Sequence, residues 1–118
     1  MSFEVKHTNQ LLDLAVSETL YESLINQLNK DFALSNVDEC ISETVIPSEL
    51  QKKLYSIVEG LIQNEFNSFL NLLYRIDLSE QQITKQVAQT QVAYIEQVTF
   101  LILKREWQKV WLKNKYSS

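Results

Sequence analysis

Apolar residues recur at helical steps along most of the chain, and the first such stripe predicts one long helix over residues 8–34. Thr8 or Asn9 suits the N-cap position, and the helix is expected to end near Leu34 or Ser35. The stripe is widened by further leucines, which favours burial on more than one side. Its main members are Leu11, Leu14, Tyr21, Ile25, Leu28 and Phe32.

Two further long helices are predicted over residues 48–74 and 80–115. Ser48 to Gln51 fits a capping box at the start of the former. The latter runs for 36 residues without a Gly or Pro. At ~1.5 Å per residue it would be roughly 54 Å long, against roughly 40 Å for each of the others. The last helix should therefore overhang the bundle by about two to three turns.

A short helix is predicted between the first two long ones. Val37, Ile41 and Val45 recur at i, i+4 and i+8, which is typical of one helix face. Residues 36–39 fit a capping box at its start. Pro47 should end this helix, because its ring and missing N–H cannot continue the hydrogen-bond ladder.

Residues 75–78 are predicted to form a tight turn before the last helix. Ser79 and Gln82 fit a capping box, flanked by Leu78 and Ile83 at the positions of a hydrophobic staple. Arg75 should satisfy the last carbonyls of the preceding helix, and Asp77 should order the turn. So short a connection makes the flanking helices antiparallel neighbours.

The sequence thus predicts an all-α fold, an antiparallel bundle of three long helices plus one short helix. Residues 1–118 should form a single helical-bundle domain, since domains commonly have ~100–200 residues. In the overhanging end, we expect Trp107 and Trp111 to pack against residues 37–46. Three cations on the opposite face should stay solvated near the acidic residues of the short helix. They are Arg105, Lys109 and Lys113. Together with the tryptophans they form a possible interaction surface.

Residue counts exclude several classes of fold and site. One Gly and one Pro in 118 residues are far below the usual ~7% and ~5%, which disfavours turn-rich β folds and removes a glycine-rich phosphate loop. One Cys and one His exclude intramolecular disulfides and multi-ligand Cys or His metal sites. No catalytic constellation is visible. We therefore expect a non-catalytic protein with no cofactor and no metal.

The distribution of charge leaves one alternative partner open. The net charge is −4, with about −7 over residues 1–65, −1 over 66–103 and +4 over 104–118. An acidic chain makes nucleic acid an unlikely partner, although the basic, Trp-containing end keeps it as an alternative. The start lacks a signal-peptide pattern, and the apolar runs are far shorter than the ~20 residues that cross a membrane. We expect a cytoplasmic protein with no membrane partner.

Several single residues could carry chemistry, and each also has a plainer explanation. His7 has no ligand neighbours at suitable spacing and should lie on the surface. Cys40 is a conceivable nucleophile, but we expect it to be buried and inert. Gly60 costs ~1 kcal/mol in a helix relative to Ala, so another helix backbone should pass close to it. Three glutamates fall within apolar stretches and are candidates for burial: Glu59, Glu65 and Glu96.

The segment Leu72-Leu73-Tyr74-Arg75-Ile76-Asp77-Leu78-Ser79-Glu80 resembles one found in small, uncharacterised helical proteins of Bacteroidota. The resemblance covers nine residues and the overall size, and it implies no activity. The function expected from the residues is that of a non-catalytic protein–protein interaction or structural module that self-associates as a homodimer. The alternative is a nucleic-acid-associated protein that uses residues 104–115.

Overall fold

The structure is a computed structural model that describes residues 7–84 and 88–116. These residues form five α-helices and one 3-10 turn, and none of them lies in a strand. The elements are α1 (Thr8–Ser17), α2 (Tyr21–Leu34), α3 (Pro47–Asn64), α4 (Phe66–Ile76), η1 (Glu80–Ile83) and α5 (Gln91–Tyr116). The all-α prediction is confirmed, but the prediction of three long helices and one short helix is wrong.

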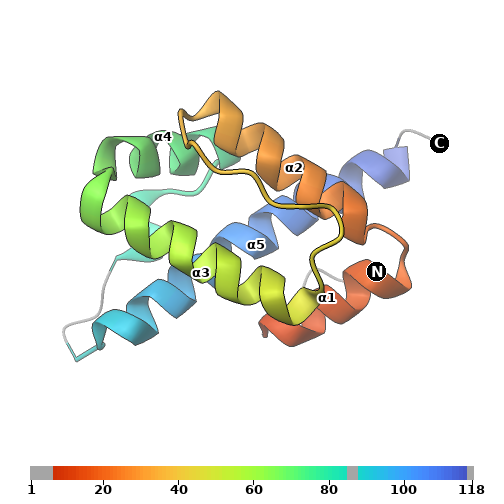
Figure 1. Cartoon of the computed structure of the whole chain (residues 1–118), viewed down its shortest axis with the longest axis horizontal. Coiled ribbons are helices and arrows are strands. Elements are labelled where there is room, and N and C mark those ends of the chain that lie inside the picture. The colour runs from red at the N-terminus through yellow and green to blue at the C-terminus, as the bar shows by residue number, and fades with distance from the viewer. Residues whose placement is uncertain (1–6, 85–87, 117–118) are drawn as a thin grey trace.

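α5 is the central element, and the other helices pack around it (Figure 1). It contacts α1, α2, α3, α4 and η1, while α1 with α2 and α3 with α4 form contacting consecutive pairs. Trp107 of α5 is among the largest fully buried side chains of the core, with Phe32 of α2 and Phe69 of α4. The buried face of α5 also includes a charged residue type, Glu106.

The first predicted helix is broken into α1 and α2 at residues 18–20. Thr19 has a φ of 57°, in the left-handed region, and the Leu20 N–H donates to Ala15 O at 2.8 Å. Residues 17–19 are polar, so the chain can turn there without exposing an apolar side chain, and Leu20 is buried just behind the turn. Two short helices can each lay an apolar face on α5, which one straight helix cannot.

The second predicted long helix is likewise divided, into α3 and α4. The break falls at Glu65, whose φ of −141° and ψ of 56° are not helical. α3 begins with Pro47 in its first turn, where the missing proline N–H would have had no partner in the helix. Pro47 therefore starts a helix rather than ending one, and Ile46, not Ser48, occupies the N-cap position.

The predicted short helix over residues 37–45 is wrong, because this segment is an irregular loop. The Asn29 side chain donates to Ile41 O at 2.8 Å and accepts the Ile41 N–H at 2.8 Å. These bonds satisfy the Ile41 backbone in place of helical partners. Val37 and Ile41 are still buried, so these apolar residues anchor a loop on the core and do not form one face of a helix.

The capping box at Ser79 is confirmed. Ser79 Oγ accepts the Gln82 N–H at 3.4 Å, and Gln82 Oε1 accepts the Ser79 N–H at 2.9 Å. Leu78 and Ile83 are both buried, as a hydrophobic staple requires. The preceding turn is also present, with Asp77 at a φ of 64°. The capped element, however, is the 3-10 turn η1 and not a long helix.

α5 is shorter than predicted, with 26 residues from Gln91 to Tyr116. Thr90 Oγ1 accepts the Ala93 N–H at 3.1 Å at the start of α5. At ~1.5 Å per residue α5 is about 39 Å long, close to the 41 Å long axis of the molecule. Lys113 and Asn114 near its end line one groove with Leu20 and Ser23 at the start of α2, so the predicted overhang of two to three turns is absent.

The close helix crossing predicted at Gly60 is also wrong. A Cβ built on Gly60 meets nothing within 4 Å outside its own helix backbone. The glycine is tolerated here rather than required by a neighbouring helix.

Candidate functional site

Two acidic side chains lie buried where α2 meets α5. The side chains of Asp31 and Glu106 are 2% and 1% exposed. Each occupies a position of its helix that is otherwise apolar: Asp31 lies between Leu28 and Phe32, and Glu106 lies beside Trp107. Buried acidic groups are uncommon unless they are paired, so this pair is the most unusual chemical feature of the described residues.

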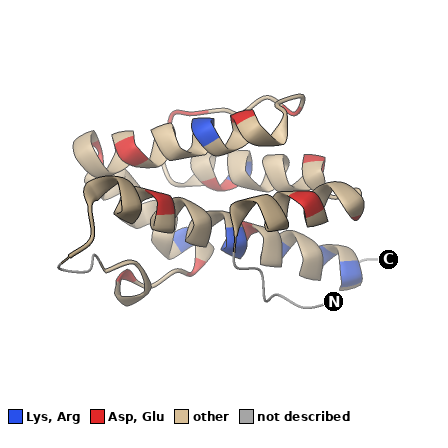
Figure 2. Cartoon of the chain, turned by 90° about the horizontal axis from the view of Figure 1, so that it is seen from below, with Lys and Arg blue, Asp and Glu red and all other residues tan. Residues whose placement is uncertain are grey.

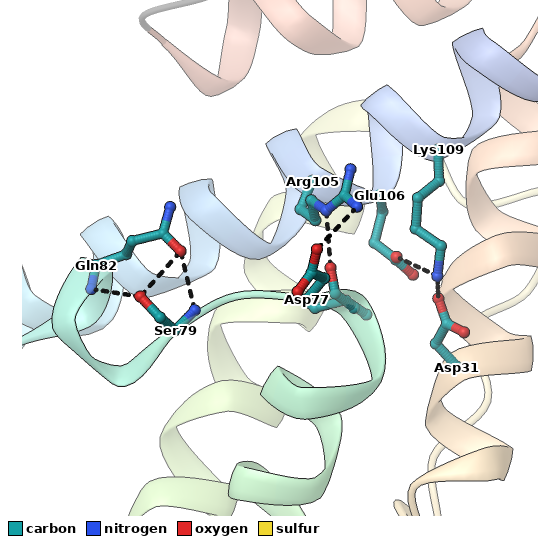
Figure 3. A network of polar contacts seen from close by, with 8 residues as sticks. Asp31, Asp77, Ser79, Gln82, Arg105, Glu106 and Lys109 are labelled. Carbon is teal, nitrogen blue, oxygen red and sulfur yellow. Dashed lines mark hydrogen bonds and ion pairs between the residues drawn. The ribbon is translucent and has the colours of Figure 1, made fainter.

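Asp31 is the centre of a polar cluster that joins three helices, and Figure 3 shows its contact with Lys109 of α5. Lys109 Nζ of α5 lies 2.7 Å from Asp31 Oδ2 and 3.6 Å from Glu106 Oε1. Gln27 Nε2 donates to the same Asp31 oxygen at 3.0 Å. Arg75 Nε of α4 lies 3.7 Å from Asp31 Oδ1. The Asp31 carboxylate is thus compensated from α2, α4 and α5.

Glu106 is held in its neutral form at neutral pH. Burial is the main cause, and the neighbouring Asp31 adds to it, so that the pKa of Glu106 rises to about 9. Lys109 opposes this rise. Neither oxygen of Glu106 accepts a hydrogen bond from a donor among the described residues. A protonated Glu106 can instead donate one hydrogen bond to the Asp31 carboxylate, which gives one of the two Glu106 oxygens a partner.

Asp31 is held in its charged form. Burial alone would raise the pKa of Asp31, but the hydrogen bonds from Glu106, Lys109 and Gln27 outweigh that effect and keep its pKa lowered. The two carboxyl groups therefore carry one proton between them at neutral pH. Because both side chains are almost completely enclosed, the pair can hold a proton but cannot contact a bound molecule directly.

A second polar contact closes the turn after α4. Arg105 Nε donates to Ile76 O at 2.8 Å, and the other end of its guanidinium lies 3.7 Å from Asp77 Oδ2 (Figure 3). The expectation that Arg75 would satisfy the last carbonyls of its helix is not met for Ile76, whose partner is Arg105 of α5. Arg75 lies near Asp31 instead.

The residues of the predicted interaction surface differ in how deeply they are buried, so they do not form one exposed surface. Trp107 is fully buried, and Trp111 is half-buried with Lys115 Nζ 4.8 Å from its ring centroid. Arg105 and Lys109 are half-buried beside acidic groups, which corrects the expectation that they stay solvated. Lys113 is exposed. Figure 2 shows basic positions along the C-terminal half of α5.

The other single residues considered in the sequence lie partly where expected and partly elsewhere. His7 is exposed as expected, whereas Cys40 is exposed in the loop and not buried. The three glutamates considered for burial are not enclosed: Glu59 is half-buried, and Glu65 and Glu96 are exposed. The buried glutamate, Glu106, was missed, although its place in the stripe of Leu103 and Val110 was a visible signal. Among the described residues, the polar and charged types buried in the core are Asp31, Ser35, Thr99 and Glu106.

α4 carries a second apolar face on the outside of the molecule. Phe66, Leu70 and Tyr74 follow one another at i, i+4 and i+8, and we call them the α4 stripe. Phe66 is 51% exposed, Tyr74 is 90% exposed and Leu70 is half-buried. Residues 66–74 include no charged side chain. A surface of this kind is more typical of an interface than of a solvated helix face.

No family model, curated protein or solved structure matches this chain. Among the described residues, no helix is long and apolar enough to cross a membrane. In that same part of the chain, no group of three or more His, Cys, Asp or Glu side chains is placed to hold a metal ion.

Proposed function

We propose that this protein is a non-catalytic interaction module that self-associates, and that the α4 stripe is the contact surface. The observation that carries the proposal is the 90% exposure of Tyr74, in line with the half-exposed Phe66 on one helix face. The buried acidic pair supports the non-catalytic part, because Asp31 and Glu106 are too enclosed to contact a substrate.

The spacing of the stripe suits pairing with a second copy of the same chain. Leu70 lies midway between Phe66 and Tyr74, four residues from each. In an antiparallel pair with its two-fold axis at Leu70, each Phe66 faces Tyr74 of the other copy. Such a contact is isologous, as in most homodimers. Each copy has a net charge of −4, and the absence of charge in residues 66–74 means that no like charges of this segment meet when two copies pair there.

The size of the stripe sets the strength of the contact. From residue 66 to residue 74 the helix rises only about 12 Å. An interface built on this stripe falls at the small end of specific protein contacts, below the roughly 1,200 Å² of a stable complex. We therefore expect a reversible dimer that forms at high protein concentration.

Sedimentation equilibrium over a range of concentrations tests the proposal. The wild type should exceed the monomer mass of 13.8 kDa as concentration rises. Tyr74→Ser and Phe66→Ser should each remain monomeric. Val92→Ser and Tyr116→Ser are matched controls, because these side chains are 56% and 76% exposed on α5, and both variants should associate like the wild type. A wild type that stays at the monomer mass at the highest concentration would overturn the proposal.

Nucleic-acid association through the end of α5 is the second candidate. It is favoured by the exposed Lys113 and Lys115 near the end of α5, and by a groove in which Lys30 of α2 and Lys113 lie together. It is weakened by the engagement of Arg105 and Lys109 with acidic groups of the chain itself. Elution from a heparin column separates the candidates, because phosphate-type binding weakens steeply with salt. Flow-through at low salt would reject this second candidate.

A further inference from the structure

We propose that the buried Asp31–Glu106 pair is a pH-sensitive latch between α2 and α5, closed by one shared proton and loosened when that proton is lost at alkaline pH. The latch is independent of the proposed self-association. It rests on the enclosure of both carboxyl groups and on the way three helices compensate only one of them.

The groups around the pair compensate a negative charge on Asp31 well, but a second negative charge on Glu106 poorly. Lys109 lies 2.7 Å from Asp31 but 3.6 Å from Glu106, so its ammonium group is committed mainly to Asp31. Arg75 of α4 and Gln27 of α2 also approach Asp31. Glu106 has no donor of its own among the described residues. A second carboxylate there would be buried next to the first.

Within residues 7–84 and 88–116, the remaining elements packed on α5 contribute no buried charged or polar side chain that could stabilise an ionised Glu106. All the buried residues of α1 and α3 are apolar. η1 contributes Ile83 as its buried side chain. Arg105 of α5 is engaged with Ile76 O and Asp77 at the end of α4. Ionisation of Glu106 therefore has to be met by movement or by water entering the contact between α2 and α5.

Proton linkage gives the direction of the response. The pKa of Glu106 is about 9 in the folded chain, against 4.5 for an ordinary glutamate, so the folded state holds an extra proton between these values. Stability contributed by this proton is complete below pH ~4.5 and is lost as pH rises toward 9. The lowered pKa of Asp31 acts oppositely, because its contribution is present above the ordinary aspartate value and lost in acid. The two groups together place the stability maximum in mild acid.

Unfolding in urea, followed by circular dichroism at several pH values from about 5 to about 9, measures the response. Because one proton separates the folded and unfolded states, the folding equilibrium constant of the wild type should fall by up to about tenfold per pH unit. Glu106→Gln keeps the size of the side chain and a donor for Asp31 but cannot ionise. Its folding constant should show a much flatter pH dependence. Equal slopes in the two proteins would overturn the latch.

Glu96→Gln is the matched control, since Glu96 lies exposed on the same helix, and it should keep the wild-type slope. A direct readout on the wild type covers a failure of Glu106→Gln to fold. The carboxyl carbon of Glu106, followed by NMR, should titrate far above pH 4.5, the ordinary value for a glutamate, and in step with the Trp107 indole signal. Titration of Glu106 near pH 4.5 would refute the shared proton. In Asp31→Asn, the titration of Glu106 should move to lower pH, and an unshifted titration would equally count against the pair.

Discussion

Lys109 Nζ lies 2.7 Å from Asp31 Oδ2, although 78 positions separate the two residues in the chain. The contact fixes the C-terminal half of α5 against α2, and Arg75 adds α4 to the same carboxylate. The side chain of Asp31 is 2% exposed and that of Lys109 is 26% exposed. Water can therefore partly solvate the Lys109 charge, whereas the Asp31 charge has to be compensated by neighbouring side chains such as Lys109.

Replacing Lys109 with Met should therefore destabilise the fold while keeping the length of the side chain. Removing one partner of a buried ion pair commonly costs ~3–5 kcal/mol. Gln27 and Arg75 remain near Asp31. We expect a loss of about 2 to 3 kcal/mol in the free energy of unfolding, measured in urea at neutral pH. Lys113→Met, at an exposed site four residues further along α5, should change it by less than about 0.5 kcal/mol. Similar losses in both variants would contradict the special role of Lys109.

The helical class could be read from the sequence because periodic apolar residues dominate the chain. The breaks could not, because none is marked by Gly or Pro: Thr19 turns in the left-handed region, and Glu65 leaves the helix with no local signal. Each break depends on whether both flanking segments can reach α5, which is a property of the packed fold. The loop over residues 37–46 depends in the same way on Asn29, which is distant in sequence.

Only part of the candidate site could be predicted from the sequence, namely the burial of its two acidic residues. Asp31 and Glu106 each stand at a helical step within an apolar stripe, so their burial could have been predicted. Their pairing could not, because it requires the angle at which α2 crosses α5. The basic residues of α5 were expected near the acidic residues of segment 37–45. Lys109 instead contacts Asp31 of α2, and Arg105 contacts Asp77 in the turn after α4.

Gly60 gives a simple test of the packing around α3. Since an added Cβ meets nothing within 4 Å outside the helix backbone, Gly60→Ala should gain helix propensity without a clash. We expect a stabilisation of up to about 1 kcal/mol, measured by thermal or urea unfolding. A destabilised variant would show that a neighbour does approach this face of α3.

Ser79 tests the start of η1. Ser79→Ala removes the acceptor for the Gln82 N–H, and we expect a loss of about 0.5 to 1 kcal/mol because the capped element is short. Ser79→Asp retains an acceptor and should recover most of that loss. Unfolding free energies of the two variants provide the measurement. If Ala and Asp were equally destabilising, the cap would contribute nothing and another feature of Ser79 would be responsible.

Trp107 and Trp111 test how the end of α5 is divided between core and surface. Trp107 is fully buried, so Trp107→Ala should cost about 3 to 5 kcal/mol in unfolding free energy. Trp107→Phe should cost less, because Phe fills part of the space and removes the buried indole N–H, which has no acceptor among the described residues.

Trp111 is only partly buried, and Lys115 covers its ring on one side. Trp111→Ala should therefore cost no more than about 1 to 2 kcal/mol. Circular dichroism is the suitable probe, since it does not depend on the tryptophan that is removed. Equal losses at the two positions would mean that α5 is enclosed on both sides to its end, and that its basic end is not available to a partner.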